Sequence, residues 1–243
     1  MIPGALGCSV ARPYYNRGST GPPPINYTPL VTGGQTAGLP INTLSLGAVT
    51  VAAGETLFAG LCVDYTIGLL VSLDVGGAGL TAAQVGTSYG SPSLRLIRFY
   101  ITAAQAPYSG NLVFDFTGGS VQPVSAAALA SKVSGLTPTF PLDRSRNASG
   151  GPATTQDSLL TAATSQASEF IYGLIGTQGA QGDTVGGWQA GMVAGQHFEP
   201  GIFVGPCIKE GWQVVNAIGT YGAKVTGATS RRYGARCDTW KGL

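Results

Sequence analysis

Residues that could carry acid–base, nucleophilic or metal chemistry are few and scattered in this sequence. His197 is the single histidine among 243 residues, which excludes a metal site built on histidines and leaves one ring for any Ser–His–Asp triad. The flanking Gly195 and Pro200 in GQHFEPG are typical of a loop. We therefore interpret His197 as a surface or interface residue.

Paired carboxylates offer the other catalytic alternative. Glycoside hydrolysis needs two carboxyl groups within about 5 to 10 Å of each other. The eleven Asp and Glu residues stand singly, and Asp183 and Glu199 are the candidates in predicted loops. The sequence contains neither G-x-x-x-x-G-K-[ST] nor a G-x-G-x-x-G between a strand and a helix, the motifs that bind nucleotide phosphates. We expect no enzymatic activity, no metal and no cofactor.

The four cysteines, Cys8, Cys62, Cys207 and Cys237, contain no C-x-x-C pair, so we expect neither a zinc site nor a redox motif. Cys62 lies in the apolar run LFAGLCVDY and is predicted to be a buried thiol. A bridge between Cys207 and Cys237 stays open as an alternative, because the sequence does not fix the distance between their Cα atoms. Free thiols are the expectation for a protein assembled in the cytoplasm.

Composition indicates a protein that packs against others. Charged residues make up 10% of the chain, against about 25% in ordinary globular proteins, and the net charge is +2. The hydrophobic fraction of 44% is too high for a disordered chain, and no apolar run reaches the length of a membrane-spanning helix. The first residues lack a basic segment and a long apolar run, so we expect synthesis without export.

Residues 1–42 predict an extended N-terminal arm outside any core. No charged residue occurs between Arg17 and Glu55, and this interval is rich in proline and glycine, without a periodic apolar face. Aromatic and arginine side chains dominate buried interface positions. The residues predicted to anchor the arm on a partner are Arg12, Tyr14, Tyr15, Arg17 and Tyr27.

The C-terminal segment KVTGATSRRYGARCDTWKGL is basic, with interleaved aromatic residues. Such a segment suits phosphate pairing and base stacking, but it suits an acidic protein surface equally well. A third alternative is a solvated terminal strand. We favour contact with a protein and expect no nucleic acid; the predicted contact residues are Arg231, Arg232, Arg236 and Trp240.

Between these ends, residues 43–243 are predicted to form one domain of short strands. SLRLIRFYI alternates Ile97, Phe99 and Ile101 with Arg98 and Tyr100, as a half-buried strand does. Similar runs recur between glycine-rich turns, and no segment of ten residues has the period of an amphipathic helix. The sequence therefore predicts an all-β fold, an antiparallel β-sandwich of jelly-roll type, and no repeat of 20 to 50 residues is evident.

SKVSGLTPTFPLDRSRNASG, residues 131–150, predicts a rigid crossover between the two halves of the sandwich. A strand over residues 126–133 is ended by Gly135, and Pro138 and Pro141 cannot donate to a sheet ladder. Asp143 is predicted to bond nearby backbone N–H groups in an Asx turn. RSRNASGGP is predicted to be an exposed polar loop.

Together these segments resemble a β-sandwich domain of tailed-bacteriophage virion proteins. The resemblance covers roughly residues 45–220 and rests on two patterns, a strand opening with Ala53-Gly54-Glu55-Thr56-Leu57 and a crossover with Ser134-Gly135-Leu136 and Pro141-Leu142-Asp143. It implies a non-enzymatic structural protein of the virion, with capsid decoration or cementing as the leading role. Its partners would be the major capsid protein or tail proteins and further copies of itself, without a membrane.

A tail or baseplate adhesin is the alternative function within the same resemblance. Such a protein would bind glycans of the host surface through exposed aromatic side chains. The candidates in the sequence are Trp188, Tyr89 and Tyr108. A shared fold does not separate the two functions.

Overall fold

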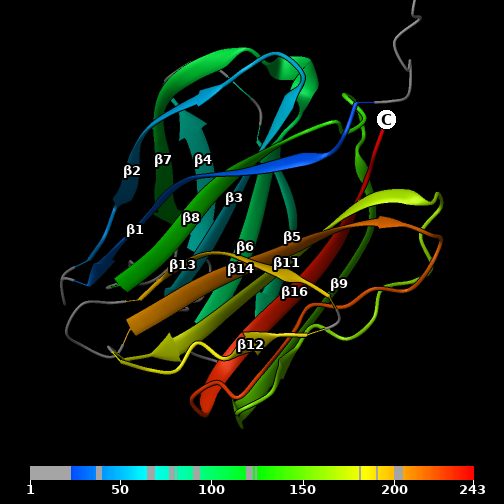
Figure 1. Ribbon diagram of the computed structural model, residues 1–243. Coiled ribbons are helices and arrows are strands. Elements are labelled where there is room, and N and C mark those ends of the chain that lie inside the picture. Colours follow the sequence, from blue (N-terminus) through cyan, green and yellow to red (C-terminus); the bar gives the residue numbers. More distant parts are fainter. Residues whose placement is uncertain are drawn as a thin grey trace, which may run out of the picture.

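A computed structural model describes residues 23–36, 40–64, 69–76, 80, 82–89, 94–118, 123, 125–180, 182–189, 191–199 and 205–243. In this part of the chain there are sixteen strands and one short 3-10 turn, η1 (Ala103–Gln105). All strand pairs within the sheets are antiparallel. The predicted all-β, antiparallel sandwich is confirmed, and Figure 1 shows the stacked sheets.

The first half of the chain forms two sheets. The five-stranded sheet has the order β1 (Asn26–Thr36), β8 (Ser125–Ser134), β3 (Glu55–Asp64), β6 (Leu94–Ile101) and β5 (Ala83–Tyr89). The three-stranded sheet has the order β2 (Thr43–Val51), β7 (Tyr108–Gly118) and β4 (Leu69–Val75). Between them lies an apolar core that includes Leu57, Leu61 and Phe114, all fully buried. We call residues 26–134 the first unit.

The second half repeats this plan. Its five-stranded sheet has the order β13 (Val193–Phe198), β14 (Gly205–Asn216), β11 (Ser168–Gly179), β16 (Arg231–Lys241) and β9 (Leu142–Ala153). Its three-stranded sheet has the order β10 (Gln156–Asp157), β15 (Lys224–Thr226) and β12 (Gly187–Trp188). We call residues 142–243 the second unit.

Both units have the same strand order. When the strands of each unit are numbered from one to eight, the large sheet is 1-8-3-6-5 and the small sheet is 2-7-4 in both. The sequence predicted a single sandwich over residues 43–243 and no repeat. The structure instead divides the chain into two eight-stranded units of equal topology.

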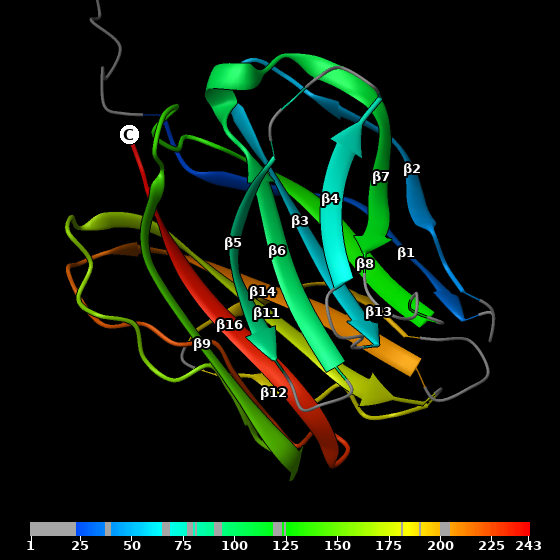
Figure 2. The same ribbon diagram turned by 180° about the vertical axis from the view of Figure 1, so that it is seen from behind.

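The two large sheets pack face to face, so the four sheets form four layers (Figures 1 and 2). A central core between the large sheets includes Phe58, Leu96, Phe170, Leu174 and Trp240. The small sheets cover the outer faces, and the outer cores of the second unit are small. The central strands β3 and β11 are therefore buried on both faces.

The crossover between the units lies where the sequence placed it. Gly135 has a φ of 79°, which glycine adopts without steric cost, and the chain then leaves the sheet of the first unit for that of the second. Backbone hydrogen bonds hold the crossover to the C-terminal strand: Thr137 N donates to Lys241 O (2.9 Å) and Lys241 N to Pro141 O (2.7 Å). Phe140 points outward and is 85% exposed.

The prediction that residues 1–42 lie outside the core is wrong for Asn26–Thr36, which form β1 and pair with β8. The prediction relied on the proline and glycine content of this segment, which is usually unfavourable for a strand. Pro29 lies at a bulge in the pairing, and Gly34 allows close approach, since a Cβ there would lie 2.7 Å from Ala126 O. Residues 1–22 lie outside the described part of the chain.

The segment RSRNASGGP is also not a loop. It belongs to β9, an edge strand whose polar, largely exposed residues resemble a loop in the sequence. Asp143 makes no local Asx turn. Its carboxylate accepts hydrogen bonds from the Ser165 backbone N–H and hydroxyl, both at 2.6 Å, and so ties the start of β9 to the segment before β11.

Among the described residues, no helix is long and apolar enough to cross a membrane.

Candidate functional site

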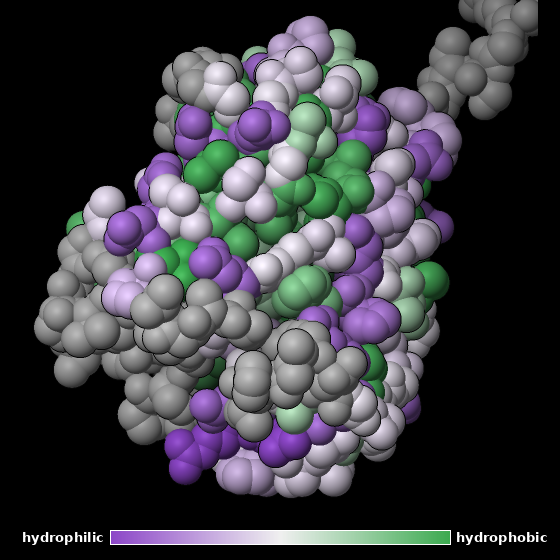
Figure 3. Space-filling model, turned by 90° about the vertical axis from the view of Figure 1, so that its left-hand side faces the viewer, coloured by the Kyte–Doolittle hydropathy of each residue, from purple (hydrophilic) through white to green (hydrophobic). Residues whose placement is uncertain are grey.

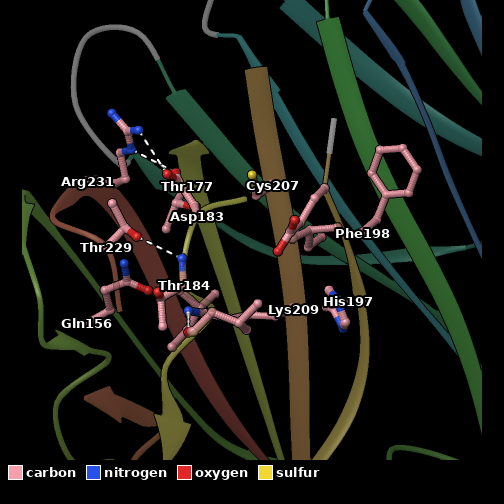
Figure 4. A pocket seen from close by; sticks show the side chains of 14 residues that line it. Gln156, Thr177, Asp183, Thr184, His197, Phe198, Cys207, Lys209, Thr229 and Arg231 are labelled. Carbon is pink, nitrogen blue, oxygen red and sulfur yellow. Dashed lines mark hydrogen bonds and ion pairs between the residues drawn. The ribbon is translucent and has the colours of Figure 1, made fainter. Parts of the chain in front are cut away.

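A polar pocket at one edge of the second unit collects most of the reactive side chains that the sequence singled out. It lies between the segment 182–186, the end of β13, the first residues of β14 and the start of β16 (Figure 4). The cavity holds about 30 Å³, the space of one or two water molecules. The ionisable side chains that line it are Asp183, His197, Glu199, Cys207, Lys209 and Arg231.

Asp183 and Arg231 form a bidentate ion pair at the mouth of this pocket. Arg231 Nε donates to Asp183 Oδ2 (2.8 Å) and Arg231 Nη2 to Asp183 Oδ1 (2.9 Å). The carboxylate also accepts a hydrogen bond from the backbone N–H of Ala180 (2.9 Å). The hydrogen bonds from Arg231 lower the pKa of Asp183, so this group remains ionised and does not suit a general acid.

Lys209 is the buried cation of the pocket, with 7% of its surface exposed. Its ammonium group donates a hydrogen bond to the backbone carbonyl of Val185. Burial lowers the pKa of Lys209 to about 8, and the nearby Cys207 and Glu199 oppose this shift. Burial raises the pKa of Cys207 to about 11, so its thiol is protonated at neutral pH and is a poor nucleophile.

His197 lies on β13 and not in the predicted loop, although its side chain is exposed as expected. Asp183 and Glu199, the two candidates for glycoside hydrolysis, do line the same pocket, but Asp183 is held by Arg231. In the described part of the chain, no three His, Cys, Asp or Glu side chains come together in a way that could hold a metal ion. The Asp183–Arg231 pair at this pocket joins the segment 182–186 to the start of β16.

The basic and aromatic residues predicted to contact a partner serve mainly within the chain. Trp240 is fully buried and meets Phe58 and Tyr100 edge-on, with ring centroids 4.6 and 4.9 Å away. Arg236 is 2% exposed, pairs with Asp238 (3.0 Å) and donates to Ser145 Oγ (2.6 Å). The prediction that these two side chains are buried against other proteins is wrong, because Trp240 packs against the first unit of the same chain and Arg236 is held by Asp238 and Ser145.

The other predicted contact residues divide into three groups. Arg232 is exposed on β16, whereas Arg231 is held by Asp183. Tyr27 is half-buried, stacks on Trp212 with ring centroids 5.1 Å apart and donates a hydrogen bond to Glu210. The remaining four, Arg12, Tyr14, Tyr15 and Arg17, lie outside the described residues.

Two of the three aromatic residues considered for glycan binding, Trp188 and Tyr108, are not free platforms. Trp188 packs against the sheet of the second unit, where a Cβ on Gly211 would lie 2.7 Å from its ring. Tyr108 is half-buried on β7, and its hydroxyl oxygen is inaccessible to solvent. Tyr89 lies on β5, and its side chain is outside the described residues.

A buried ionic cluster between the large sheets was missed by the sequence analysis. Arg98 is fully buried, and its Nη1 lies 3.1 Å from Asp238 Oδ2. Its guanidinium also lies 3.8 Å from the centroid of the Tyr172 ring, a cation–π contact. Burial lowers the pKa of Arg98, and Asp238 opposes the shift. The alternation of residues 94–101 placed Arg98 on the polar face of its strand, which the sequence analysis expected to meet water. In the structure, the face of β6 that carries Arg98 packs against the second unit.

Glu210 forms the second part of this cluster. It accepts hydrogen bonds from the hydroxyls of Tyr27, Tyr172 and Ser131, the last at 3.2 Å. Tyr27 comes from β1, Ser131 from β8 and Tyr172 from β11, so one carboxylate ties together strands of both units. Only the folded pairing of the sheets reveals this site.

No family model, curated protein or solved structure matches this chain in the comparisons.

Proposed function

We propose that this chain is a non-enzymatic structural protein of a tailed-bacteriophage virion, and that it decorates and stabilises the capsid through contacts between subunits. The observation that carries the proposal is that buried charged and aromatic side chains hold the two units of the chain together. In the described residues, the fully buried ion pair Arg98–Asp238 and the contacts of Trp240 with Phe58 and Tyr100 fasten two β-units into one block. Such a block suits a mechanical role, and the resemblance of the sequence to virion proteins gives that role its context.

The end of the block where residues 1–22 join the fold supports the proposed attachment. Pro24 approaches Gly135 there, and Leu243 N donates to Gly135 O (3.0 Å), so the start of the described chain, the crossover and the C-terminus lie together. Phe140 and Leu243 are 85% and 50% exposed at this end. We define the docking end as Pro23–Ile25, Phe140 and Leu243. Residues 1–22, with their prolines, tyrosines and arginines, would extend from this end onto a neighbouring capsid protein.

A second apolar surface lies on the side where β1 and β2 form the edges of their sheets. Figure 3 shows apolar residues gathered over the first unit on this side. Leu30 and Val31 of β1 pack against the core of the first unit but remain partly exposed. This surface would be covered by further subunits, and many weak contacts would add up over the particle.

The test is incorporation into particles. Deletion of residues 2–22 and the substitution Phe140→Ser each remove part of the proposed attachment while leaving the described strands intact. We expect both variants to fold and to be lost from purified particles. Leu70→Ser is the matched control, since Leu70 is 65% exposed on β4, away from the docking end. Normal occupancy of the deletion variant, or adsorption defects in particles of normal composition and stability, would contradict the proposal and favour the adhesin.

A further inference from the structure

The two units align residue for residue along their central strands. Glu55 at the start of β3 pairs with Ser134, the last residue of β8. Glu169 near the start of β11 pairs with Lys241, the last residue of β16. Since β3 and β11 are the third strands of their units, and β8 and β16 the eighth, Glu55 and Glu169 occupy the same position of the common topology.

At the interface between the units, equivalent positions of β3 and β11 lie opposite each other. Three successive positions of β3 that face the second unit lie opposite their own equivalents on β11. The facing pairs are Phe58 with Tyr172, Gly60 with Leu174, and Cys62 with Gly176. A surface in which equivalent positions meet each other is the mark of a two-fold, isologous interface.

The strands beside the central pair obey the same symmetry. The first unit places β8 on β14 and β1 on β13, and the second unit places β16 on β6 and β9 on β5. Each contact between an eighth and a sixth strand, or between a first and a fifth strand, is thus made twice, once in each direction. The large sheets are related by a two-fold rotation about an axis that runs between β3 and β11.

Equivalent residues at this interface differ in size, and each difference is matched by its partner. A Cβ on Gly60 would lie 2.9 Å from Leu174 Cδ1, so Leu174 occupies the space that Gly60 leaves. Two positions along, the relation is reversed, because a Cβ on Gly176 would lie 2.6 Å from Cys62 Sγ. Two leucines would collide at the first position, and two glycines would leave a void there.

Equivalent residues also differ in charge. Arg98 pairs across the strands with Gly60, and Glu210 pairs with Leu174, so Arg98 and Glu210 occupy the same position of their units. A cation in the first unit therefore has an anion as its counterpart in the second.

The residues that these charges meet in the other unit are equivalent as well. Ser131 pairs with Phe58 on β3, and Asp238 pairs with Tyr172 on β11. The Arg98–Asp238 contact (3.1 Å) and the Glu210–Ser131 contact (3.2 Å) therefore join the same two positions of the common topology, with the units exchanged.

We infer that the two units of this chain form an interface with the two-fold geometry of a symmetric dimer. Equivalent residues of the two units have diverged, so that each unit complements the other unit and not a second copy of itself. Two first units would leave Arg98 facing Ser131, a buried cation without a counter-charge. Two second units would place Glu210 beside Asp238, and like charges would be buried together. The partner for which each surface is built is the other eight-stranded unit, independently of the proposed role in a virion.

A reciprocal swap in the full-length chain tests this inference. Gly60→Leu places leucine opposite leucine, as two second units would, and Leu174→Gly places glycine opposite glycine, as two first units would. We expect both single variants to melt well below the wild type. The double variant carries the wild-type pair in the reverse orientation, and we expect its melting temperature to exceed that of either single variant. Losses that add in the double variant would overturn the inference.

The matched control is the swap Ala59→Gly with Gly173→Ala. These positions are equivalent in the alignment, but they face the separate outer cores of the two units, so their effects are expected to add without rescue. If the melting temperature also recovered in this control, recovery would not depend on whether the two positions face each other. That result would overturn the inference.

The charges provide a second readout if Gly60→Leu does not fold. The exchange Arg98→Glu with Glu210→Arg alone should be severely destabilising, because the carboxylate introduced at position 98 would face Asp238. All variants of this exchange carry Arg236→Leu, because Arg236 also pairs with Asp238 (3.0 Å) and would otherwise lose its counter-charge. In this background, adding Ser131→Asp and Asp238→Ser should recover stability, since both contacts are then restored in exchanged places. A quadruple variant that melts no higher than the double exchange would contradict the equivalence of the Arg98–Asp238 and Glu210–Ser131 contacts.

Discussion

Phe58 and Tyr172 occupy the same position in the third strand of their units and stack on each other across the central interface, with ring centroids 5.3 Å apart. The equivalence is not complete, because only the second-unit residue carries a hydroxyl. That hydroxyl donates to Glu210, whereas Arg98 occupies the position of the first unit that is equivalent to Glu210. The shared packing holds the units together, and the differing polar atoms make the two sides complementary.

The first prediction concerns the buried counter-charge of this interface. Asp238→Asn removes the carboxylate that compensates Arg98 and Arg236. Leaving a buried charge unpaired costs about 3–5 kcal/mol, and urea denaturation should show a loss of that order. Asp157→Asn is the control, because its pair with Lys224 is partly exposed and should be worth less than about 1 kcal/mol. Equal losses in the two variants would mean that the central cluster is not important for stability.

The second prediction locates the boundary of the N-terminal segment. Deletion of residues 2–22 should leave the melting temperature unchanged within a few degrees, as no described strand is touched. Deletion of residues 2–36 removes β1 and exposes the edge of β8, and it also removes Tyr27 from its stack on Trp212. Thermal melts followed by circular dichroism should show a cooperative transition for the shorter deletion only. A folded longer deletion would show that β1 is dispensable for the fold.

The third prediction concerns pH. Burial and the nearby Asp143 raise the pKa of Glu169 to about 8, while the unfolded chain has the ordinary value of 4.5. The folded state therefore retains a proton that the unfolded state loses, and the stabilisation is present below pH 4.5 and lost as the pH rises through 8. Glu169→Gln should remove this dependence and raise stability at pH 8 more than at pH 5.

The control for this experiment is Glu55→Gln, at the equivalent position of the first unit. Glu55 is partly exposed, pairs with Lys132 at 2.8 Å and accepts a hydrogen bond from Ala52 N at 2.7 Å. Its removal should lower stability at pH 8. Chemical denaturation at the two pH values distinguishes the variants, and an unchanged pH profile in Glu169→Gln would show that another group is responsible.

The fourth prediction concerns the thiols. Cys62, Cys207 and Cys237 form no disulfide in the structure, so the open alternative of a Cys207–Cys237 bridge is excluded in this fold. Cys62 and Cys237 are fully buried and should resist alkylation until the protein unfolds. Cys207 should react slowly at pH 7 and faster towards pH 10, because its pKa is raised to about 11. Mass spectrometry after timed alkylation measures each site, and rapid labelling of Cys237 in folded protein would contradict this packing.

The sequence predicted the parts of the fold that depend on local pattern. The alternation around Ile97 and Phe99 identified a strand, and Gly135 with Pro141 identified the crossover, because glycine and proline restrict the backbone directly. The strand β1 was missed because Pro29 and Gly34 normally weaken strands, and here they lie at a bulge and at a close contact. Such tertiary reasons are not visible in a local pattern.

The central cluster was beyond prediction for a similar reason. Arg98 and Asp238 are 140 residues apart and look like ordinary charges on the polar faces of their strands. Their partnership depends on which two sheets pack together. Trp240 and Arg236 were expected to be buried against other proteins, whereas the structure buries both of them within this chain. The sequence pattern does not reveal which surface covers a given side chain.

The proposed role is tested most directly by cryo-electron microscopy of intact phage particles assembled with the full-length chain and with the variant that lacks residues 2–22. We expect the four-layered block to be seen on the capsid surface, with its docking end towards the shell, and this density to be lost in the deletion variant. Density only at the tail or baseplate, or capsid density that persists at full occupancy without residues 2–22, would contradict it.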